Sequence, residues 1–213
     1  SARPSHRGLP SAICPSFRPL GAARAGHVER LAEHAFRVRE LARRADHVII
    51  DGPPSAINGD PNLGGLFDIW HDAASGPLDP ADHSDLGPKR PVLSPDPGNV
   101  RVRWFVINPR PEGVPDEMLN AAVRQRFASF DAEHHITDQS KHPAMHKTAS
   151  LDVICLLQGE VDLILDKART RVKPGQIVIQ RGTSHGWEAI GGPALLLAVL
   201  IDRPLKSGDH DPI

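Results

Sequence analysis

The chain has 213 residues, with 25 Lys and Arg against 26 Asp and Glu, which gives a formal net charge of −1 at pH 7. A balanced charge provides no general attraction to nucleic acid or to an anionic membrane surface. No apolar run approaches the roughly 18–20 residues that a membrane helix needs. We therefore expect neither nucleic acid nor membrane as a partner, but a small molecule or a second copy of the chain.

The first 27 residues contain four arginines and no acidic residue, without a convincing amphipathic face. We expect residues 1–27 to form an irregular extension, with a targeting segment or a misplaced start as the alternatives. The chain has two cysteines, Cys14 and Cys155, too few for a disulfide framework. Such cysteine usage is typical of a reducing compartment, so we expect a cytoplasmic protein.

Residues 28–141 are expected to hold a helix, strands, a proline-rich loop and a second helix, all packing on a barrel. The first helix is predicted over residues 28–45, where four apolar side chains recur at helical spacing. They are Leu31, Ala35, Val38 and Leu41. The following "HVIIDGPPS" reads as a short strand stopped by a Gly-Pro-Pro turn, and "GPPSAINGD" reads as a turn cluster.

Further along this region, residues 65–72 and 100–108 read as strands, the second because apolar and polar residues alternate strictly. Residues 73–99 are rich in Pro, Asp, Ser and Gly without periodicity, which predicts a long surface loop. Residues 115–130 predict the second helix, with acidic residues in its first turn and one apolar face. That face consists of Leu119, Val123, Phe127 and Phe130.

The last region, residues 142–213, is predicted to be the core of a β-barrel. Short apolar segments follow one another at near-regular spacing and are separated by turn residues, which is typical of an all-β barrel or sandwich. The strands are expected near residues 146–157, 160–166, 169–173, 176–180 and 193–202.

Two motifs within this region carry the chemistry. The first runs from His146-Lys-Thr148 over three residues to Asp152, and then over six residues to Gly159. The second runs from Gly175 through "QIVI" and "QRG" to His185. In order and separation these motifs resemble those of the small single-domain cupins, the cupin type-2 conserved-barrel family. The resemblance implies a double-stranded β-helix barrel, or jelly roll, with a few flanking helices.

Strand geometry adds an independent reason for these residues to meet. His146, Thr148 and Asp152 have the same parity, so on an extended strand they point to one face. Imidazole and carboxylate ligands with open positions suit non-haem iron, and zinc, manganese or nickel could be held by the same set. The resemblance therefore implies a divalent metal bound by His146, Asp152 and His185.

The motifs also depart from the family pattern, and the departures leave a second reading open. Thr148 stands where the family has a second histidine, Asp152 replaces a glutamate, and Gln180 replaces a proline. In the metal-free reading, His146 and His185 serve as hydrogen-bonding or acid/base groups. His142 could join the site only if its loop folds over the barrel mouth.

Three further residues are expected to bind substrate, although Trp187 also suits the core. They are Thr148, Gln180 and Trp187. The site residues predict a cupin-type small-molecule enzyme acting on an oxygenated, aromatic or carboxylated metabolite, as an isomerase, lyase, decarboxylase or oxygenase. The alternative is a metabolite-binding module without turnover. Because the family often dimerises, a homodimer is expected.

Overall fold

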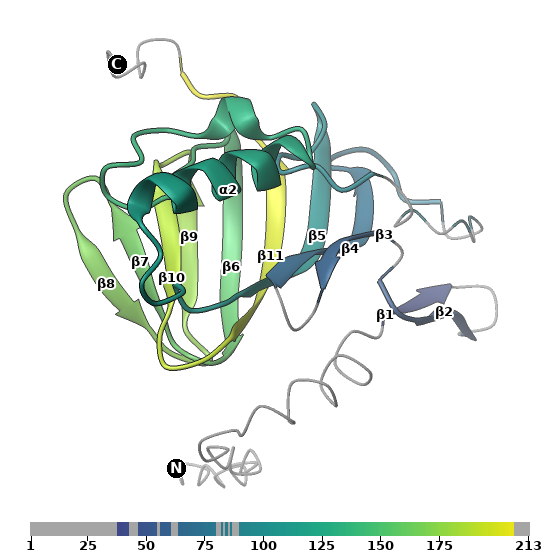
Figure 1. Ribbon diagram of the computed structural model, residues 1–213. Coiled ribbons are helices and arrows are strands. Elements are labelled where there is room, and N and C mark those ends of the chain that lie inside the picture. The colour runs from purple at the N-terminus through teal and green to yellow at the C-terminus, as the bar shows by residue number, and fades with distance from the viewer. Residues whose placement is uncertain are drawn as a thin grey trace, which may run out of the picture.

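The computed structural model describes residues 38–42, 47–54, 56–60, 64–79, 82, 84, 86 and 90–206. These residues form three antiparallel sheets with the strand orders β3-β4-β5-β11-β6-β9, β10-β7-β8 and β1-β2 (Figure 1). The larger sheet comprises β3 (Ala56–Asp60), β4 (Gly64–Ala73), β5 (Asn99–Ile107), β11 (Ala194–Asp202), β6 (Ser150–Gln158) and β9 (Ile177–Arg181). The smaller sheets comprise β10 (His185–Ala189), β7 (Val161–Leu165), β8 (Arg169–Val172), β1 (Val38–Ala42) and β2 (His47–Gly52).

The all-β prediction is confirmed, as are most of the predicted strands and the second helix. That helix is α2 (Asp116–Ala128), followed by a 3-10 turn, η1 (Glu133–His135). Its predicted apolar face is its inner face, because Phe127 and Phe130 are buried in a cluster with Ala132. In Figure 1, α2 crosses in front of the larger sheet. Arg126 fastens it there by donating to the carbonyl of Asn58 on β3 at 2.6 Å.

The helix predicted over residues 28–45 is wrong for residues 38–42, which are the part of that range that the structure describes. Val38–Ala42 is strand β1, paired with β2, while residues 28–37 and the predicted extension 1–27 lie outside the described residues. Helical spacing of apolar residues is a weak signal when a partner strand is available. The β-branched run Val48-Ile49-Ile50 provides that partner.

Three other predictions need correction. The "GPPSAINGD" segment contains strand β3, which pairs with β4. Glycines permit this tight pairing, since a Cβ on Gly59 would lie 2.4 Å from the carbonyl oxygen of Gly64. Strand β10, which begins at His185, was not predicted and lies between the predicted strands 176–180 and 193–202. The strand predicted from residue 146 begins at Ser150 instead, with His146 joining the sheet through isolated bridges.

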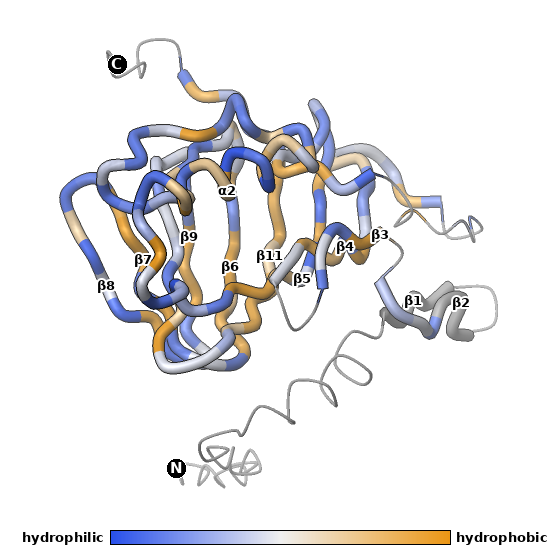
Figure 2. The backbone as a smooth tube through the Cα atoms, in the orientation of Figure 1, coloured by the Kyte–Doolittle hydropathy of each residue, from blue (hydrophilic) through white to orange (hydrophobic). Residues whose placement is uncertain are grey.

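The apolar core lies between the larger sheet and the β10-β7-β8 sheet. Leu156 of β6, Leu196 of β11 and Val161 of β7 are completely buried there, and Trp187 of β10 packs with them. Figure 2 shows the hydrophobic colours concentrated on β6, β7 and β11, whereas β8 is largely hydrophilic. Among the described residues, no helix is long and apolar enough to cross a membrane.

The outer face of the larger sheet is also apolar, which is unusual for a sheet that faces solvent. The strand register places two uncharged rows side by side across β9, β6, β11 and β5. The rows are Ile179, Val153, Val199 and Val102, and Ile177, Cys155, Leu197 and Trp104. Ile177 is 61% exposed and Ile179 is 56% exposed, and the other six are partly exposed. This outer face is called the apolar face below.

Candidate functional site

The two motif histidines lie side by side. His146 and His185 form an isolated antiparallel bridge, in which each backbone N–H donates to the other's carbonyl at 2.8 and 2.9 Å. This backbone pairing holds the ring centroids 4.3 Å apart. The edge of the Phe127 ring closes one side of His146, and the edge of Trp187 lies next to His185. The two segments predicted to bring their imidazoles together therefore do so.

Both imidazoles are fixed in the same tautomer. The Nδ1 of His146 lies 2.8 Å from the carbonyl oxygen of Ala144, and the Nδ1 of His185 lies 2.9 Å from that of Thr183. Because a carbonyl oxygen only accepts, each Nδ1 carries the proton and donates it. In the neutral rings each Nε2 then presents a lone pair, which can accept a hydrogen bond or bind a cation.

Burial keeps the two rings neutral. It lowers the pKa of His146 to about 3, and the adjacent His185 lowers it further. Burial also lowers the pKa of His185 to about 4, against a smaller opposing effect of its bond to Thr183. The charged form is disfavoured because an imidazolium here would lose its hydration without gaining a carboxylate partner. At neutral pH the pair consists of two hydrogen-bond acceptors.

Asp152 is buried in the same barrel but has a different environment. It is 3% exposed, and burial raises the pKa of its carboxyl to about 6, while a bond from Ser150 and the charge of Arg103 oppose the shift. Its Oδ1 has no hydrogen-bond partner. Arg103, and neither of the paired histidines, is the charge that acts on this carboxyl. Asp152 therefore belongs to a polar cluster of its own beside the histidine pair.

Thr183 connects the two parts of the site. Its carbonyl accepts from His185, and its hydroxyl donates to Oε1 of Gln180 at 2.9 Å. Gln180 is 3% exposed and lies directly opposite Asp152 in the register of β9 and β6, with its Nε2 unpaired. Gln180 therefore points into the fold, and its Nε2 amide has no hydrogen-bond partner there.

Thr148 does not substitute for the missing histidine. It is buried, and its hydroxyl bonds to that of Ser150 at 2.8 Å. Within the described part of the chain, no group of three or more His, Cys, Asp or Glu side chains is placed to hold a metal ion. The predicted metal set of His146, Asp152 and His185 is therefore not assembled as a three-ligand group.

Two imidazoles do not fit a catalytic metal by themselves, since such sites commonly use three protein ligands. Asp152 does not complete a metal site with the two histidines. Its side chain is one methylene shorter than that of glutamate, and it interacts with Ser150 and Arg103 instead. No chemical step proposed below passes through a metal.

His142 and Trp187 also have defined places. His142 lies against β10, so close that a Cβ on Gly186 would be 2.9 Å from its Nδ1, and its charge acts on His146. It is therefore a neighbour of the pair. Trp187 belongs to the apolar core and also contacts the ring of His185 by its edge. It can accordingly form one apolar wall beside the pair.

The buried charges of β4 and β5 were not predicted from the sequence. Arg101 and Arg103 of β5 and Asp68 of β4 are each at most 2% exposed. A signal was present in "NVRVRW", where the arginines have the parity of Phe105 and the opposite parity of Val102 and Trp104. Either the arginines or Val102 and Trp104 could have faced the interior. The usual rule that apolar residues face inward predicts Val102 and Trp104 there, but the structure places the arginines inside.

Comparison with known proteins gives short sequence matches and weak structural ones. No family model matches the chain. It is 48% identical over 44 residues to the phomopsin biosynthesis cluster protein C' of Diaporthe leptostromiformis, covering 20% of this chain and 23% of that protein. It is 36% identical over 73 residues to the cupin-domain-containing oxidoreductase virC of Hypocrea virens, covering 32% of this chain and 38% of that protein. The chain thus matches well under half of these relatives' length.

A cupin 2 conserved barrel domain protein from Salinispora arenicola aligns with 16% identity and a TM-score of 0.29, covering 48% of this chain and 63% of that one. A cupin superfamily protein from Desulfitobacterium hafniense aligns with 13% identity and a TM-score of 0.30, covering 48% and 66%. The structure is all-β, with antiparallel sheets enclosing one core, and a stretch of the chain is similar to a cupin-domain protein, so the fold agrees with that of a cupin barrel.

Proposed function

We propose that the protein is a cupin-type small-molecule enzyme that transfers a proton on a carbonyl-containing metabolite inside the barrel. The observation that carries this proposal is a buried carboxyl with an unpaired Oδ1, at Asp152, in register with Gln180. The Oε1 of Gln180 accepts from Thr183, whose carbonyl anchors one ring of the neutral histidine pair. The kinship with proteins described as cupin-domain-containing oxidoreductases supports a small-molecule enzyme.

In the proposed reaction, Asp152 is the group that moves the proton. Its carboxylate accepts a proton from the carbon next to the substrate carbonyl, and an enolate forms. The Asp152 carboxyl, whose proton exchanges with solvent, then returns a proton to the enolate at a different carbon or at oxygen. Acid/base groups work best when their pKa lies near the operating pH, and the pKa of Asp152 is raised to about 6. The reaction consumes no oxidant, so atoms and electrons balance as an isomerisation.

The histidine pair has a different task in this proposal. With a pKa of about 3 and about 4, the two rings are too weakly basic to act as general bases at neutral pH. Their Nε2 lone pairs instead accept hydrogen bonds from a hydroxyl or N–H of the substrate. The ring centroids lie 4.3 Å apart, so the two Nε2 acceptors together fix the orientation of the substrate hydroxyl or N–H.

The same weak basicity favours a second candidate function, a barrel that binds a metabolite without turnover. Thr148, which stands where the family has a second histidine, supports this alternative. The two functions differ in whether a bound compound exchanges protons with solvent.

Proton exchange can be measured without knowing the overall reaction. Pyruvate, oxaloacetate, acetoacetate and hydroxypyruvate would be tested for binding by thermal shift, and those that bind would be incubated in D2O and followed by proton NMR. The enzyme proposal predicts faster deuterium incorporation with the wild-type protein than with D152N, while R169Q serves as a surface control. A compound that binds in the barrel but exchanges no faster than in buffer would contradict turnover and favour the binding module.

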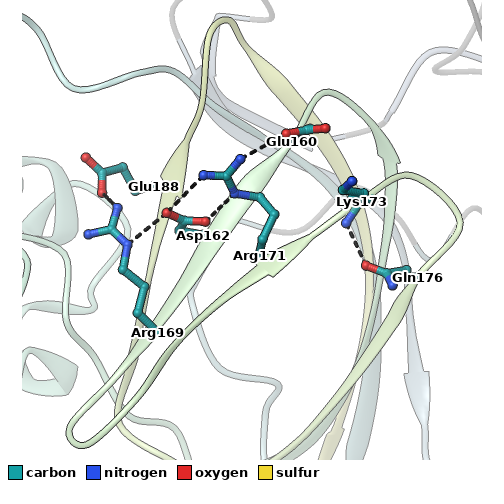
Figure 3. Close-up of polar contacts among 7 residues, drawn as sticks. All are labelled: Glu160, Asp162, Arg169, Arg171, Lys173, Gln176 and Glu188. Atoms are coloured by element: carbon teal, nitrogen blue, oxygen red, sulfur yellow. Dashed lines mark hydrogen bonds and ion pairs between the residues drawn. The ribbon is translucent and has the colours of Figure 1, made fainter.

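We also propose that two copies associate through the apolar face. Its two rows span four strands spaced about 4.8 Å apart, and the face continues to the edge strand β9. Such a surface, with adjoining residues, is of the size that can contribute to the roughly 800 Å² per partner of a stable dimer. The β10-β7-β8 sheet differs from the apolar face, because ion pairs cover its outer side. In these pairs Arg169 and Arg171 bind the carboxylates of Asp162, Glu160 and Glu188 (Figure 3).

A further inference from the structure

The inner face of β5 is polar where a barrel wall is expected to be apolar. Arg101 is 1% exposed and Arg103 is 2% exposed, and both extend into the interior of the fold. The next residues of the same parity, Phe105 and Ile107, pack against the apolar core. Two buried guanidinium groups are costly unless their charges and N–H groups are matched.

The protein matches these two cations only in part. Asp68 is the carboxylate that forms ion pairs with both, and it accepts hydrogen bonds from Nη1 of Arg101 and, at 3.4 Å, from Nη2 of Arg103. Nη2 of Arg103 donates to the carbonyl of Val92 at 2.5 Å. Nη1 of Arg103 and Nε of Arg101 are buried without a hydrogen-bond partner. One direct carboxylate for two guanidiniums leaves donors unused.

An unused acceptor lies on the same inner face of the larger sheet, with β11 between it and the unused donors. Asp152 and Arg103 act on each other electrostatically, yet Oδ1 of Asp152 and Nη1 of Arg103 each lack a hydrogen-bond partner. The register makes them diagonal neighbours across β11, because Ala198 pairs with Arg103 and Leu200 pairs with Asp152. Ala198, beside Arg103, has only a methyl group. Nε2 of Gln180, also unpaired, adds a donor on the Asp152 side.

We propose that this part of the barrel is a subsite for a small hydroxycarboxylate. The carboxylate of the ligand accepts from Nη1 of Arg103 and from Nε2 of Gln180, and its hydroxyl donates to Oδ1 of Asp152. This inference names the substrate class of the proposed enzyme and in that sense rests on the proposed function. The subsite itself binds with or without turnover, and it can be tested separately.

Other ligand classes fit these atoms less well. A neutral apolar ligand would leave two N–H donors and one carboxylate oxygen buried and unsatisfied, at a loss of binding for each. A simple carboxylate would satisfy Arg103 but not Asp152. A neutral alcohol would satisfy Asp152 but not Arg103. Burial also lowers the pKa of Arg103 to about 10, as expected where a cation has too few counter-charges.

The arginines of the smaller sheet provide the matched control. Arg169 lies on the surface and has carboxylate partners in Asp162 and Glu188 (Figure 3). Removing it changes the protein's charge by the same amount as removing Arg103. It leaves the barrel interior unchanged.

The test uses three ligands of nearly equal size and the full chain. Binding of lactate, propionate and lactamide would be measured by titration calorimetry, and the larger series mandelate, phenylacetate and mandelamide would be measured in parallel. We expect each hydroxycarboxylate to bind at least about tenfold more tightly than the analogue without the hydroxyl and the analogue without the charge. R103Q should remove the preference for the charge, D152N should remove the preference for the hydroxyl, and R169Q should keep both.

Several outcomes would overturn the proposal. Equal affinities within each series, or no binding of any of the six compounds to the wild-type protein, would mean that the unpaired atoms are satisfied by water only. Retention of the charge preference in R103Q would refute the assigned donor. If R103Q fails to fold, Q180L tests the second donor and should weaken carboxylate binding about tenfold. Binding without proton exchange would refute the proposed enzyme and leave the subsite standing.

Discussion

Acidification should destabilise the protein through its histidine pair. The pKa of both rings is lowered in the folded state, to about 3 for His146 and about 4 for His185, from an ordinary value of 6.5. The unfolded chain therefore binds more protons than the folded one as the pH falls below 6.5, and stability is lost in that range. Above pH 6.5 both states are neutral at these positions, and the pair causes no loss.

The magnitude follows from the size of the shifts. At pH 5 an unfolded histidine is almost fully protonated while both folded rings remain neutral, so each costs about 2 kcal/mol and the pair about 4 kcal/mol relative to pH 7.5. Asp152 acts in the opposite direction over this range, because its pKa is raised to about 6 and its neutral form suits burial. Its contribution is about 1 kcal/mol and is present in every histidine variant.

The assay is urea unfolding at pH 7.5 and pH 5.0, followed by tryptophan fluorescence. The H146Q/H185Q double variant lacks both titrations, so between the two pH values it should lose about 4 kcal/mol less stability than the wild type. H185Q alone should recover about half of that difference. H134Q, at an exposed histidine, should behave as the wild type does. Equal losses in wild type and double variant would refute the assignment of a buried, neutral pair.

Three further predictions concern other parts of the fold. D152N should stabilise the protein by up to about 3 kcal/mol at pH 7.5, with the gain disappearing below about pH 4 in the same urea assay, because the raised pKa of Asp152 means that its ionised form opposes folding. G159A should lower the unfolding free energy by at least about 2 kcal/mol more than G175A. Both glycines have positive φ, but only at Gly159 would a methyl group lie 2.6 Å from a backbone oxygen. Equal losses of unfolding free energy in the two variants would contradict the crowding at Gly159. I179K should shift the protein from dimer to monomer in light scattering, and an unchanged mass would contradict association through the apolar face.

The strands of the barrel were predictable because their signals are local. Alternation, β-branched residues and glycine turns locate β5 to β9 and β11 within a few residues, and the residues that carry the motifs locate the histidine pair. The failures occurred where pairing decided the structure. Val38–Ala42 has helical spacing but pairs with β2, and Ala56–Asp60 has turn residues but pairs with β4.

The site was predictable in part for the same reason. Parity placed Asp152, Ile154 and Leu156 on the inner face of β6, and all three are buried. It could not decide which face of β5 is inner, because Arg101 and Arg103 alternate with apolar residues and either face could have been buried. Partner strands on both sides settle the question, and they direct the arginines inward.

The central claim is that His146 and His185 form a neutral pair with both Nε2 atoms open. Long-range proton–nitrogen NMR of protein labelled with nitrogen-15 at histidine reports the tautomer and the protonation of each ring directly. The account predicts that both rings carry their proton on Nδ1 and remain neutral from pH 8 to pH 5. A pair member protonated on Nε2, or titrating near pH 6.5, would contradict it.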